Sequence, residues 1–308
     1  MDEAIRKAEV LIEALSYIRK FRDRLTVIKL GGSAMEDKEA VRATLQDVVF
    51  METVGMRPIL VHGGGAAITE AMTRAGLKAT FVQGRRYTDE ATLAIVARVL
   101  IDEINRDLVQ TIERLGGRAA GLHPRTTNVV YGERLVLPPE AGEPVDLGLV
   151  GRVTRVDTSV VENLCVGGVV PVIPSLAVDP TGQLLNVNAD TAAAAVASHL
   201  RAEKLVFLSD THGILLDRTD QGSLATSLTA GRCRELMTRG VIDAGMIPKV
   251  EACLDSLRMG VRKTHIIDGR IRHSLLLEIY TDRGIGTEIV LERERESESS
   301  AAGSAAPA

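Results

Sequence analysis

The stretch Thr26–Ala34, TVIKLGGSA, decides the fold. Its first three residues are β-branched and predict a short buried strand that Lys29 closes. Gly31 and Gly32 then predict a turn, before a helical pattern that starts near Glu36. A strand, a glycine turn and a helix form the crevice in which open α/β sheets bind their ligands.

Two interpretations of this turn remain open at this point. Glycines let a backbone approach a phosphate closely, and the N–H groups of a turn or a helix start attract anions. Lys29 would then add a positive charge beside that cradle. The same residues also fit a plain tight turn with a solvated lysine, and a pair of glycines alone does not separate the two.

The composition is that of a globular protein with an aliphatic core. The chain has 308 residues, which fits one large or two modest domains, and 45% of them are hydrophobic. Aromatic residues make up only 3% and tryptophan is absent. The net charge of −4, without a basic run, argues against a nucleic-acid partner, so an anionic substrate would need a local basic pocket.

The cysteines point to a reducing compartment, and the N-terminus does not point to a membrane protein. Cys165, Cys233 and Cys253 are scattered and lack the spacing of a zinc site, and their odd number does not suit a disulfide framework. The N-terminus is charged, and no apolar run approaches the roughly 20 residues of a spanning helix. We expect a soluble cytoplasmic protein that binds no membrane.

Hydrophobic periodicity predicts strands that alternate with helices along most of the chain. Strands are expected at 26–30, 58–62, 118–122, 149–156, 169–173, 184–188, 205–209, 263–267 and 287–291. Helices are expected at 36–55, 66–75, 89–115, from 158, and at 189–201, 229–239 and 246–259. This alternation predicts an α/β fold with a mainly parallel sheet, with an irregular stretch at 79–88 and short hairpins before 148.

The two ends of the chain lie outside this alternation. Residues 2–22 carry apolar side chains at helical spacing, which fits either a helix packed on its own domain or an arm that forms an oligomer. The tail 292–308 is charged and then small and polar, so we expect it to be disordered.

A second glycine turn follows the next strand, in Val61–Gly65, VHGGG. Two glycine turns at the ends of adjacent strands predict one shared crevice. His62 lies between strand and turn and could be a ligand, but a histidine in this position is more often a hydrogen-bonded structural residue. We therefore predict no catalytic role for it.

Three further motifs carry charged or amide side chains. Arg86, in GRRYTD, could grip a carboxylate through two hydrogen bonds, or it could belong to a surface pair beside a helix cap. Strand alternation places Asn186 and Asn188 on one face, and Asp190 follows in the first turn of an alanine-rich helix. Lys249 follows a proline at a helix start, where a cation opposes the helix dipole unless an anion lies nearby.

With these pieces in this order, the chain resembles the amino-acid kinase family over about Glu9–Leu291. The motifs that carry the resemblance are VIKLGGSAM, VHGGG, the G-x-R-x-T of 84–88, NVNADTAA, LSDTHGIL, GMIPKVEACL and HIIDGR followed by LLLEIYTDRGIGTEI. A P-loop, an intact GxGxxG, an HExxH and a GxSxG are all missing from the sequence.

The resemblance implies a three-layer αβα sandwich in two lobes. An N-terminal helix at 1–24 would form an oligomerisation arm, 25–180 would bind an acyl amino acid, and 181–291 would bind the nucleotide. The implied reaction is the transfer of phosphate from ATP to the side-chain carboxylate of N-acetyl-L-glutamate, giving its 5-phosphate for arginine biosynthesis. The implied Mg²⁺ is bound mainly by the nucleotide, without a separate metal site on the protein.

The resemblance also implies the site residues. Lys29 and Lys249 would flank the transferring phosphoryl group, and Asp190 would organise the two lysines. The residues implied for the acyl amino acid are Gly64, Gly65, Arg86 and Asn186. Those implied for the nucleotide are Gly31, Gly32, Asp210, Thr211, His212, Gly213, Ile214, Leu215, Val241, Ile242 and Asp243.

The N-terminal helix resembles the arm of family members that arginine inhibits and that assemble as hexamers. The matching positions for an arginine site are Tyr17, Lys204, His265, Glu278 and Gly284. The resemblance thus implies L-arginine as a feedback inhibitor and a homo-oligomer, with a hexamer as the expected form.

Departures from the family pattern leave alternatives open. Arg85 and Tyr87 lie where the family usually has a leucine and a valine, and the stretch 123–126 replaces a glycine-rich turn. In HGGGAA, alanines follow the glycines where the family usually has a proline and an acidic residue. One alternative is a kinase of an acylated or carrier-linked aminoadipate. Another is a non-catalytic arginine-sensing subunit, against which the retained lysines and Asp190 argue.

Overall fold

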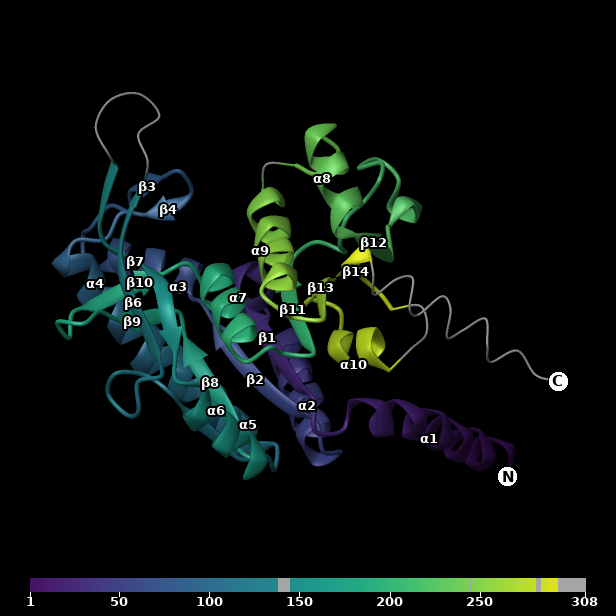
Figure 1. The fold of residues 1–308 in the computed structure, drawn as a ribbon. Helices are drawn as coiled ribbons and strands as arrows, with labels where there is room; N and C mark the ends of the chain where they lie inside the picture. The colour runs from purple at the N-terminus through teal and green to yellow at the C-terminus, as the bar shows by residue number, and fades with distance from the viewer. Residues whose placement is uncertain (138–144, 244, 281–283, 293–308) are drawn as a thin grey trace.

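An eight-stranded sheet forms the centre of the molecule in the computed structural model, which describes residues 1–137, 145–243, 245–280 and 284–292 (Figure 1). The strand order is β12-β14-β13-β11-β1-β2-β8-β5. The bounds are β1 Leu25–Leu30, β2 Arg57–His62, β5 Ala119–Gly121, β8 Val170–Pro174, β11 Lys204–Ser209, β12 Ser227–Thr229, β13 Lys263–Asp268 and β14 Thr287–Val290. The predicted disordered tail lies outside the described residues from 293 onward.

The sheet is mainly parallel, as the alternation of strands and helices predicted. Its neighbours pair in parallel register except β13 with β14, which are antiparallel. The central strands are buried almost throughout, as expected for strands that helices cover on both faces. Their carboxyl ends share one edge of the sheet, where both glycine turns lie.

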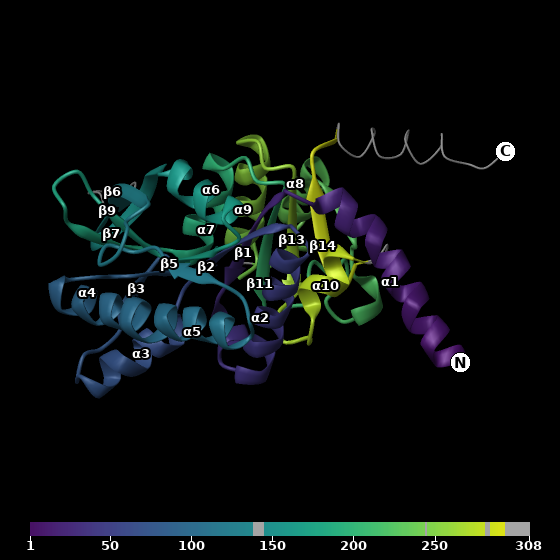
Figure 2. The same cartoon turned by 90° about the horizontal axis from the view of Figure 1, so that it is seen from below.

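Helices cover both faces and complete the three-layer sandwich (Figure 2). Side chains of one strand alternate between two hydrophobic cores: Val27 packs in the core with α7 and α9, and Ile28 packs in the core with α2 and α5. The helix bounds are α2 Lys38–Thr53, α3 Gly65–Arg74, α4 Glu90–Ala97, α5 Arg106–Arg114, α6 Thr158–Val166, α7 Ala189–His199, α8 Ala230–Thr238, α9 Ile247–Arg258 and α10 Ser274–Ile279.

A small closed barrel stands beside the main sheet, in the strand order β10-β7-β6-β9. Its strands are β6 Val130–Leu137, β7 Val145–Val156, β9 Leu176–Val178 and β10 Leu184–Val187. The predicted lobe boundary at 181 falls between β9 and β10, which pair with each other. Residues on both sides of the predicted boundary therefore contribute strands to the same barrel.

The predicted long helix at 89–115 consists of three parts. A π-helical segment, η2 (Arg98–Asn105), lies between α4 and α5. A π segment shifts the face that the following residues present and is typical of functional sites. The stretch at 79–88, predicted to be irregular, forms a short hairpin of β3 (Phe81–Val82) and β4 (Arg85–Arg86).

Helix α1 (Asp2–Phe21) extends away from the body of the molecule in both views (Figures 1 and 2). Phe21 at its end is buried, whereas Leu11 and Ile12 expose 71% and 70% of their surface. Most of this helix is therefore not packed on its own domain. Within the part of the chain that the structure describes, no helix combines the length and apolar character needed to cross a membrane.

Candidate active site

Three charged residues from distant parts of the chain meet at the carboxyl edge of the sheet. The Nζ of Lys29 lies 2.8 Å from Oδ1 of Asp190, and the Nζ of Lys249 lies 3.2 Å from Oδ2 of the same carboxylate. Their side chains expose only 7%, 16% and 19% of their surface, in the order Lys29, Asp190, Lys249. One carboxylate thus holds two ammonium groups in a poorly hydrated position, as the resemblance implied.

The charge state of this trio follows from its geometry. Burial alone would raise the pKa of Asp190, but the ion pairs with Lys29 and Lys249 outweigh it and hold the pKa below its usual value. Asp190 is therefore ionised at neutral pH. With two cations and one anion, the trio keeps one net positive charge.

Local sequence features place each of the three side chains. Lys29 is near the end of β1, and a Cβ on Gly31 would lie 2.3 Å from its Nζ, so the glycine makes room for the lysine across the turn. Asp190 lies in the first turn of α7, where Oδ1 of the capping residue Asn188 accepts a hydrogen bond from its backbone N–H. Lys249 lies in the first turn of α9 behind a proline, as predicted.

A cavity of about 190 Å³ opens beside Lys29. All four residues predicted for the acyl amino acid line it, namely Gly64, Gly65, Arg86 and Asn186. Gly31 and Gly32, predicted for the nucleotide, line this cavity as well and are not among the residues around the larger cavity described below. The two glycine turns therefore line one cavity.

Arg86 is buried in the wall of this cavity, which rules out the surface pair. Its Nη2 donates hydrogen bonds to the carbonyl oxygen of Gly65 at 3.1 Å and to Oγ1 of Thr69 at 2.7 Å. Its guanidinium lies 4.8 Å from the ring centre of Phe81. These contacts hold the guanidinium rigidly at the start of α3, where a carboxylate can meet both a cation and helix N–H groups.

Gly64 leaves no room for a side chain. A Cβ there would lie 2.5 Å from Cδ1 of Ile104 and 2.9 Å from Cδ2 of Leu100. Gly64 caps α3 and Gly65 begins it, so the unsatisfied N–H groups of the first helical turn lie at the cavity. The turn thus supplies backbone donors to the cavity.

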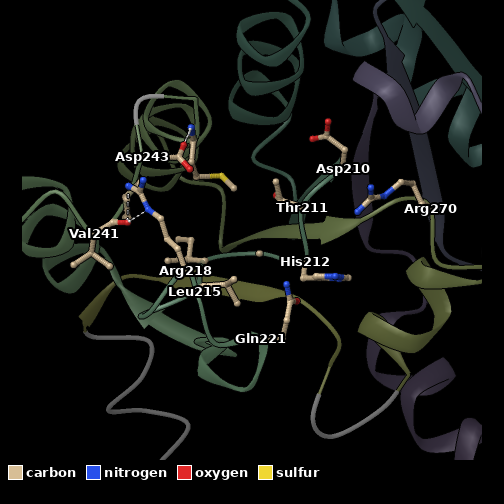
Figure 3. A pocket seen from close by; sticks show the side chains of 13 residues that line it. Asp210, Thr211, His212, Leu215, Arg218, Gln221, Val241, Asp243 and Arg270 are labelled. Carbon is tan, nitrogen blue, oxygen red and sulfur yellow. Dashed lines mark hydrogen bonds between the residues drawn. The ribbon is translucent and has the colours of Figure 1, made fainter.

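A larger cavity of about 320 Å³ lies over the C-terminal half of the sheet (Figure 3). It contains all the remaining predicted nucleotide residues, which are 210–215 and 241–243. Gly213 has a φ of +125°, and a Cβ there would lie 2.6 Å from Oγ1 of Thr287, so only glycine fits this loop. The residues that the sequence interpretation missed are Arg218, Gln221, Met246 and Arg270.

Arg270 could have been predicted, because it follows the carboxyl end of β13 at the same edge as the other site residues. Its guanidinium donates two hydrogen bonds to Asp268, at 2.9 and 2.7 Å. Burial alone would raise the pKa of Asp268, but the bonds from Arg270 hold it below its usual value. Arg218, whose guanidinium donates to the carbonyl oxygen of Val241, follows no strand end, and the sequence held no signal for it.

The residues predicted for arginine binding form a second polar cluster, away from both cavities. Nδ1 of His265 lies 2.7 Å from Oε1 of Glu278, and Nζ of Lys204 lies 3.1 Å from Nε2 of His265. Burial, with the nearby Lys263, lowers the pKa of Lys204 to about 8. Gly284 has a φ of +60°, and a Cβ on it would lie 2.7 Å from Oε2 of Glu278.

Tyr17 joins this region to the arm, because its ring packs edge-on against Tyr280, with the ring centres 6.1 Å apart. The five predicted residues thus lie in one region formed by α1, β11, β13 and α10.

The departures from the family pattern divide into two groups. Arg85 lines the smaller cavity, so it can influence which ligand fits there. None of residues 123–126 is among those lining either cavity, and Arg125 is paired with Asp102 at 2.5 and 2.6 Å. Among the described residues, no three His, Cys, Asp or Glu side chains are grouped to hold a metal ion.

His62 has the structural role that its position predicted. It is fully buried, with Nδ1 3.2 Å from the carbonyl oxygen of Gly63 and Nε2 3.0 Å from Nδ2 of Asn105. Burial lowers the pKa of His62 to about 4, so the ring is neutral at physiological pH.

This burial predicts a specific loss of stability in acid. Between the unfolded pKa of 6.5 and the folded pKa of about 4, the unfolded chain binds a proton that folded His62 does not. Stability is therefore lost as the pH falls through this window, by about 2 kcal/mol at about pH 5. In urea unfolding near neutral pH and near pH 5, the wild type should lose about 2 kcal/mol more than His62→Asn, because the other histidines contribute equally to both proteins. An equal loss in both proteins would contradict the assignment.

The amino acid kinase family model matches residues 24–268. An acetylglutamate kinase of Pelotomaculum thermopropionicum is 49% identical over 287 residues, which cover 92% of this chain and 97% of that protein. An acetylglutamate kinase of Nostoc sp. is 45% identical over 293 residues, covering 94% and 96%.

Solved structures share the fold at lower identity. An N-acetylglutamate synthase from Neisseria gonorrhoeae, complexed with coenzyme A and N-acetyl-glutamate, superposes with a TM-score of 0.81 at 24% identity, covering 92% of this chain and 63% of that one. A carbamate kinase from Giardia lamblia bound to AMP-PNP gives a TM-score of 0.62 at 16% identity, covering 88% and 99%.

Proposed function

Because the chain belongs to the amino acid kinase family, we propose that it transfers the γ-phosphoryl group of ATP to the side-chain carboxylate of N-acetyl-L-glutamate. The product is N-acetylglutamyl 5-phosphate, an acyl phosphate on the route to arginine. The substrate on the nucleotide side is the magnesium complex of ATP. Relatives named acetylglutamate kinase match this chain over nearly their whole length, which supports this substrate.

The observation that carries the proposal is the position of the charged trio between the two cavities. Lys29 lines the smaller cavity, and so does Ala189, the neighbour of Asp190. Met246, the N-cap of α9 and three residues before Lys249, lines the larger cavity. An acyl amino acid in the smaller cavity and a nucleotide in the larger one would therefore meet at the two lysines.

The reaction needs positioning and positive charge rather than a base. A carboxylate is already a nucleophile at neutral pH, so one of its oxygens attacks the γ-phosphorus while the bond from that phosphorus to the ADP oxygen breaks. No proton has to be transferred. The barrier comes from bringing two anions together and from the charge on the phosphoryl oxygens, which the lysines and the glycine N–H groups can stabilise.

Each group of residues around the site has one role in this mechanism. Arg86 and the start of α3 hold the carboxylates of the acyl amino acid, and the turn at Gly31 keeps Lys29 directed at the phosphoryl group. Asp190 prevents the two ammonium groups from repelling each other and keeps both at the point of transfer. Residues 210–215 and 241–243 enclose the nucleotide.

Hydroxylamine trapping tests the substrate. The purified protein should form an acyl hydroxamate from N-acetylglutamate and hydroxylamine, with one ADP released per hydroxamate. N-acetyl-aminoadipate should give at least about tenfold less, because the extra methylene moves its carboxylate beyond the lysines. A hydroxamate from N-acetyl-aminoadipate alone would assign the enzyme to that substrate, and ATP binding without any hydroxamate would favour a non-catalytic subunit.

We further propose that L-arginine inhibits the enzyme at the second polar cluster. Glu278 supplies a buried carboxylate there, which accepts hydrogen bonds from His265 and from the backbone N–H groups of Ile285 and Gly286. A guanidinium or an α-ammonium group would find an anionic partner in it. Tyr17 and Phe21, on α1, connect this cluster to the arm.

Gly284→Ala tests the arginine site. A Cβ at this position would collide with the Glu278 carboxylate, and the backbone conformation disfavours any side chain. Arginine should inhibit the wild type at millimolar concentration, and the variant should need at least about tenfold more arginine with its kcat unchanged, since the position is not in the catalytic site. Equal sensitivity of both proteins, or no inhibition of the wild type, would contradict the proposal.

The arm supports a homo-oligomer that α1 holds together. Ile5, Val10, Leu11, Ile12 and Leu15 are exposed on this helix, which is more apolar surface than an isolated surface helix normally shows. We propose a hexamer in which the arms of neighbouring dimers interlace. Light scattering on the purified protein should give a mass near six chains, and a dimer at micromolar concentration would contradict it.

A further inference from the structure

Asn105, the last residue of the π segment η2, lies buried beneath the second glycine turn. Its Nδ2 is 3.0 Å from the carbonyl oxygen of Val172 and 3.0 Å from Nε2 of His62. A carbonyl oxygen only accepts, so this atom of Asn105 is the amide nitrogen and donates to both partners. Nε2 of His62 is therefore an acceptor and carries no hydrogen.

The tautomer of His62 follows from this contact. A neutral imidazole carries one hydrogen, which must then be on Nδ1. Nδ1 faces the carbonyl oxygen of Gly63 at 3.2 Å, to which it donates. Asn105 thus selects the hydrogen bond that His62 makes with the turn, although Asn105 is not among the residues lining the cavity.

The bond from His62 fixes the one peptide of the turn that the backbone leaves unrestrained. Gly63 N–H donates to the carbonyl oxygen of Leu30, and Ser175 N–H donates to the carbonyl oxygen of His62. The peptide between Gly63 and Gly64 has only the His62 ring to hold its carbonyl oxygen, among the hydrogen bonds of the described residues. In a trans peptide the C=O and the N–H point in opposite directions, so the N–H of Gly64 points away from His62.

The π segment explains how Asn105 reaches this position. In a π segment, residues five apart lie on one face, which brings Leu100 and Asn105 to the same side. Leu100 and Ile104 contact Gly64, and Asn105 contacts Gly121, where a Cβ would lie 2.2 Å from its Oδ1. The same segment thus packs against the turn and supplies the residue that orients it.

We propose that Asn105 and His62 are positioning residues for phosphoryl transfer: Asn105 selects the Nδ1–H tautomer of His62, and that hydrogen holds the Gly63–Gly64 peptide so that the glycine N–H groups face the reacting carboxylate. This role rests on the proposed function. It assigns a task in the reaction to a buried pair that touches neither substrate.

Two variants of His62 separate its two hydrogen bonds. The amide nitrogen of asparagine lies where Nδ1 was, so His62→Asn keeps a donor to the Gly63 carbonyl. His62→Gln places its amide near the former Nε2, so it keeps the contact with Asn105 and loses the donor to the turn. Both variants remove the ring, and His62→Asn leaves the larger void, so a higher kcat in His62→Asn cannot be ascribed to better packing.

The tautomer is measured by ¹⁵N NMR of the histidine rings, and His62→Gln identifies the His62 signal among those of the six histidines. The wild type should show Nδ1–H. Asn105→Asp, whose carboxylate cannot donate, should convert the ring to Nε2–H or to the doubly protonated form. A wild-type ring with Nε2–H would overturn the proposal, whether or not the protein turns over N-acetylglutamate.

The effect of each variant on catalysis is measured as kcat with N-acetylglutamate. Its effect on the turn is measured as the NMR amide shifts of Gly64 and Gly65. His62→Asn should retain at least about tenfold more kcat than His62→Gln, with similar KM for ATP, although its unfolding midpoint should not be higher. His62→Gln should shift both glycine amide signals, and His62→Asn should leave them near the wild type. Equal kcat in the two variants, or equal amide shifts, would overturn the positioning role. If the wild type has no activity, the proposed function fails, and the ring tautomer and the amide shifts still decide this inference.

Discussion

Replacing Lys249 by methionine is expected to lower kcat with N-acetylglutamate by at least about a hundredfold, since it removes one of the two ammonium groups that we propose flank the transferring phosphoryl group. Its ammonium group is 3.2 Å from Asp190, and its side chain is only 19% exposed, so its charge acts in a poorly hydrated place. The KM for ATP should change by less than tenfold, because the lost charge matters most in the transition state.

Arg258→Met is the matched control for this variant. Arg258 lies at the other end of the same helix, α9, where its exposed side chain pairs with Asp255. Its loss should leave kcat unchanged. Steady-state kinetics on both proteins test the claim, and a kcat for Lys249→Met within threefold of the wild type would remove Lys249 from the mechanism.

Asp190→Ala is expected to lower both kcat and stability. The substitution leaves Lys29 and Lys249 facing each other without their shared counter-ion, and Lys29 is only 7% exposed. Breaking a buried ion pair by removing one partner costs about 3–5 kcal/mol of unfolding free energy. The loss of lysine positioning should lower kcat by about a hundredfold or more.

The exposed pair on α9 provides the comparison. Asp255→Ala removes the partner of Arg258, which lies 2.9 Å away at the surface, and should cost at most about 0.5 kcal/mol. Urea unfolding at neutral pH measures both variants. A cost below about 1 kcal/mol for Asp190→Ala would mean that the trio is better hydrated than its geometry indicates.

The motifs at strand ends were predictable because the physics there is local. Lys29 and the two glycine turns directly follow apolar strands, and parallel strands end at one edge, so a shared crevice followed from the sequence. Asp190 and Lys249 both lie in first helical turns, which the alanine-rich stretch and Pro248 indicated. Their meeting at one carboxylate is a tertiary contact, which only the resemblance implied.

Other features depend on packing that local patterns do not encode. The π segment has the same apolar spacing as the helices around it, so the long helix was predicted as one piece. Asn105 looked like any polar residue on that helix, although it is 1% exposed and holds His62. The pairing of β10 with β9 and β7 depends on chain reversals in the barrel, which no local pattern in the sequence encodes.

The most direct test of the account follows an oxygen atom. N-acetylglutamate labelled with ¹⁸O in its side-chain carboxylate is incubated with ATP, hydroxylamine and the protein, and the released phosphate is analysed by mass spectrometry. If the carboxylate attacks the γ-phosphorus, hydroxylamine then cleaves the bond between the acyl carbon and the bridging oxygen, so each phosphate carries one ¹⁸O. Phosphate without ¹⁸O would show that water, and not the carboxylate, accepts the phosphoryl group, which would contradict the proposed reaction.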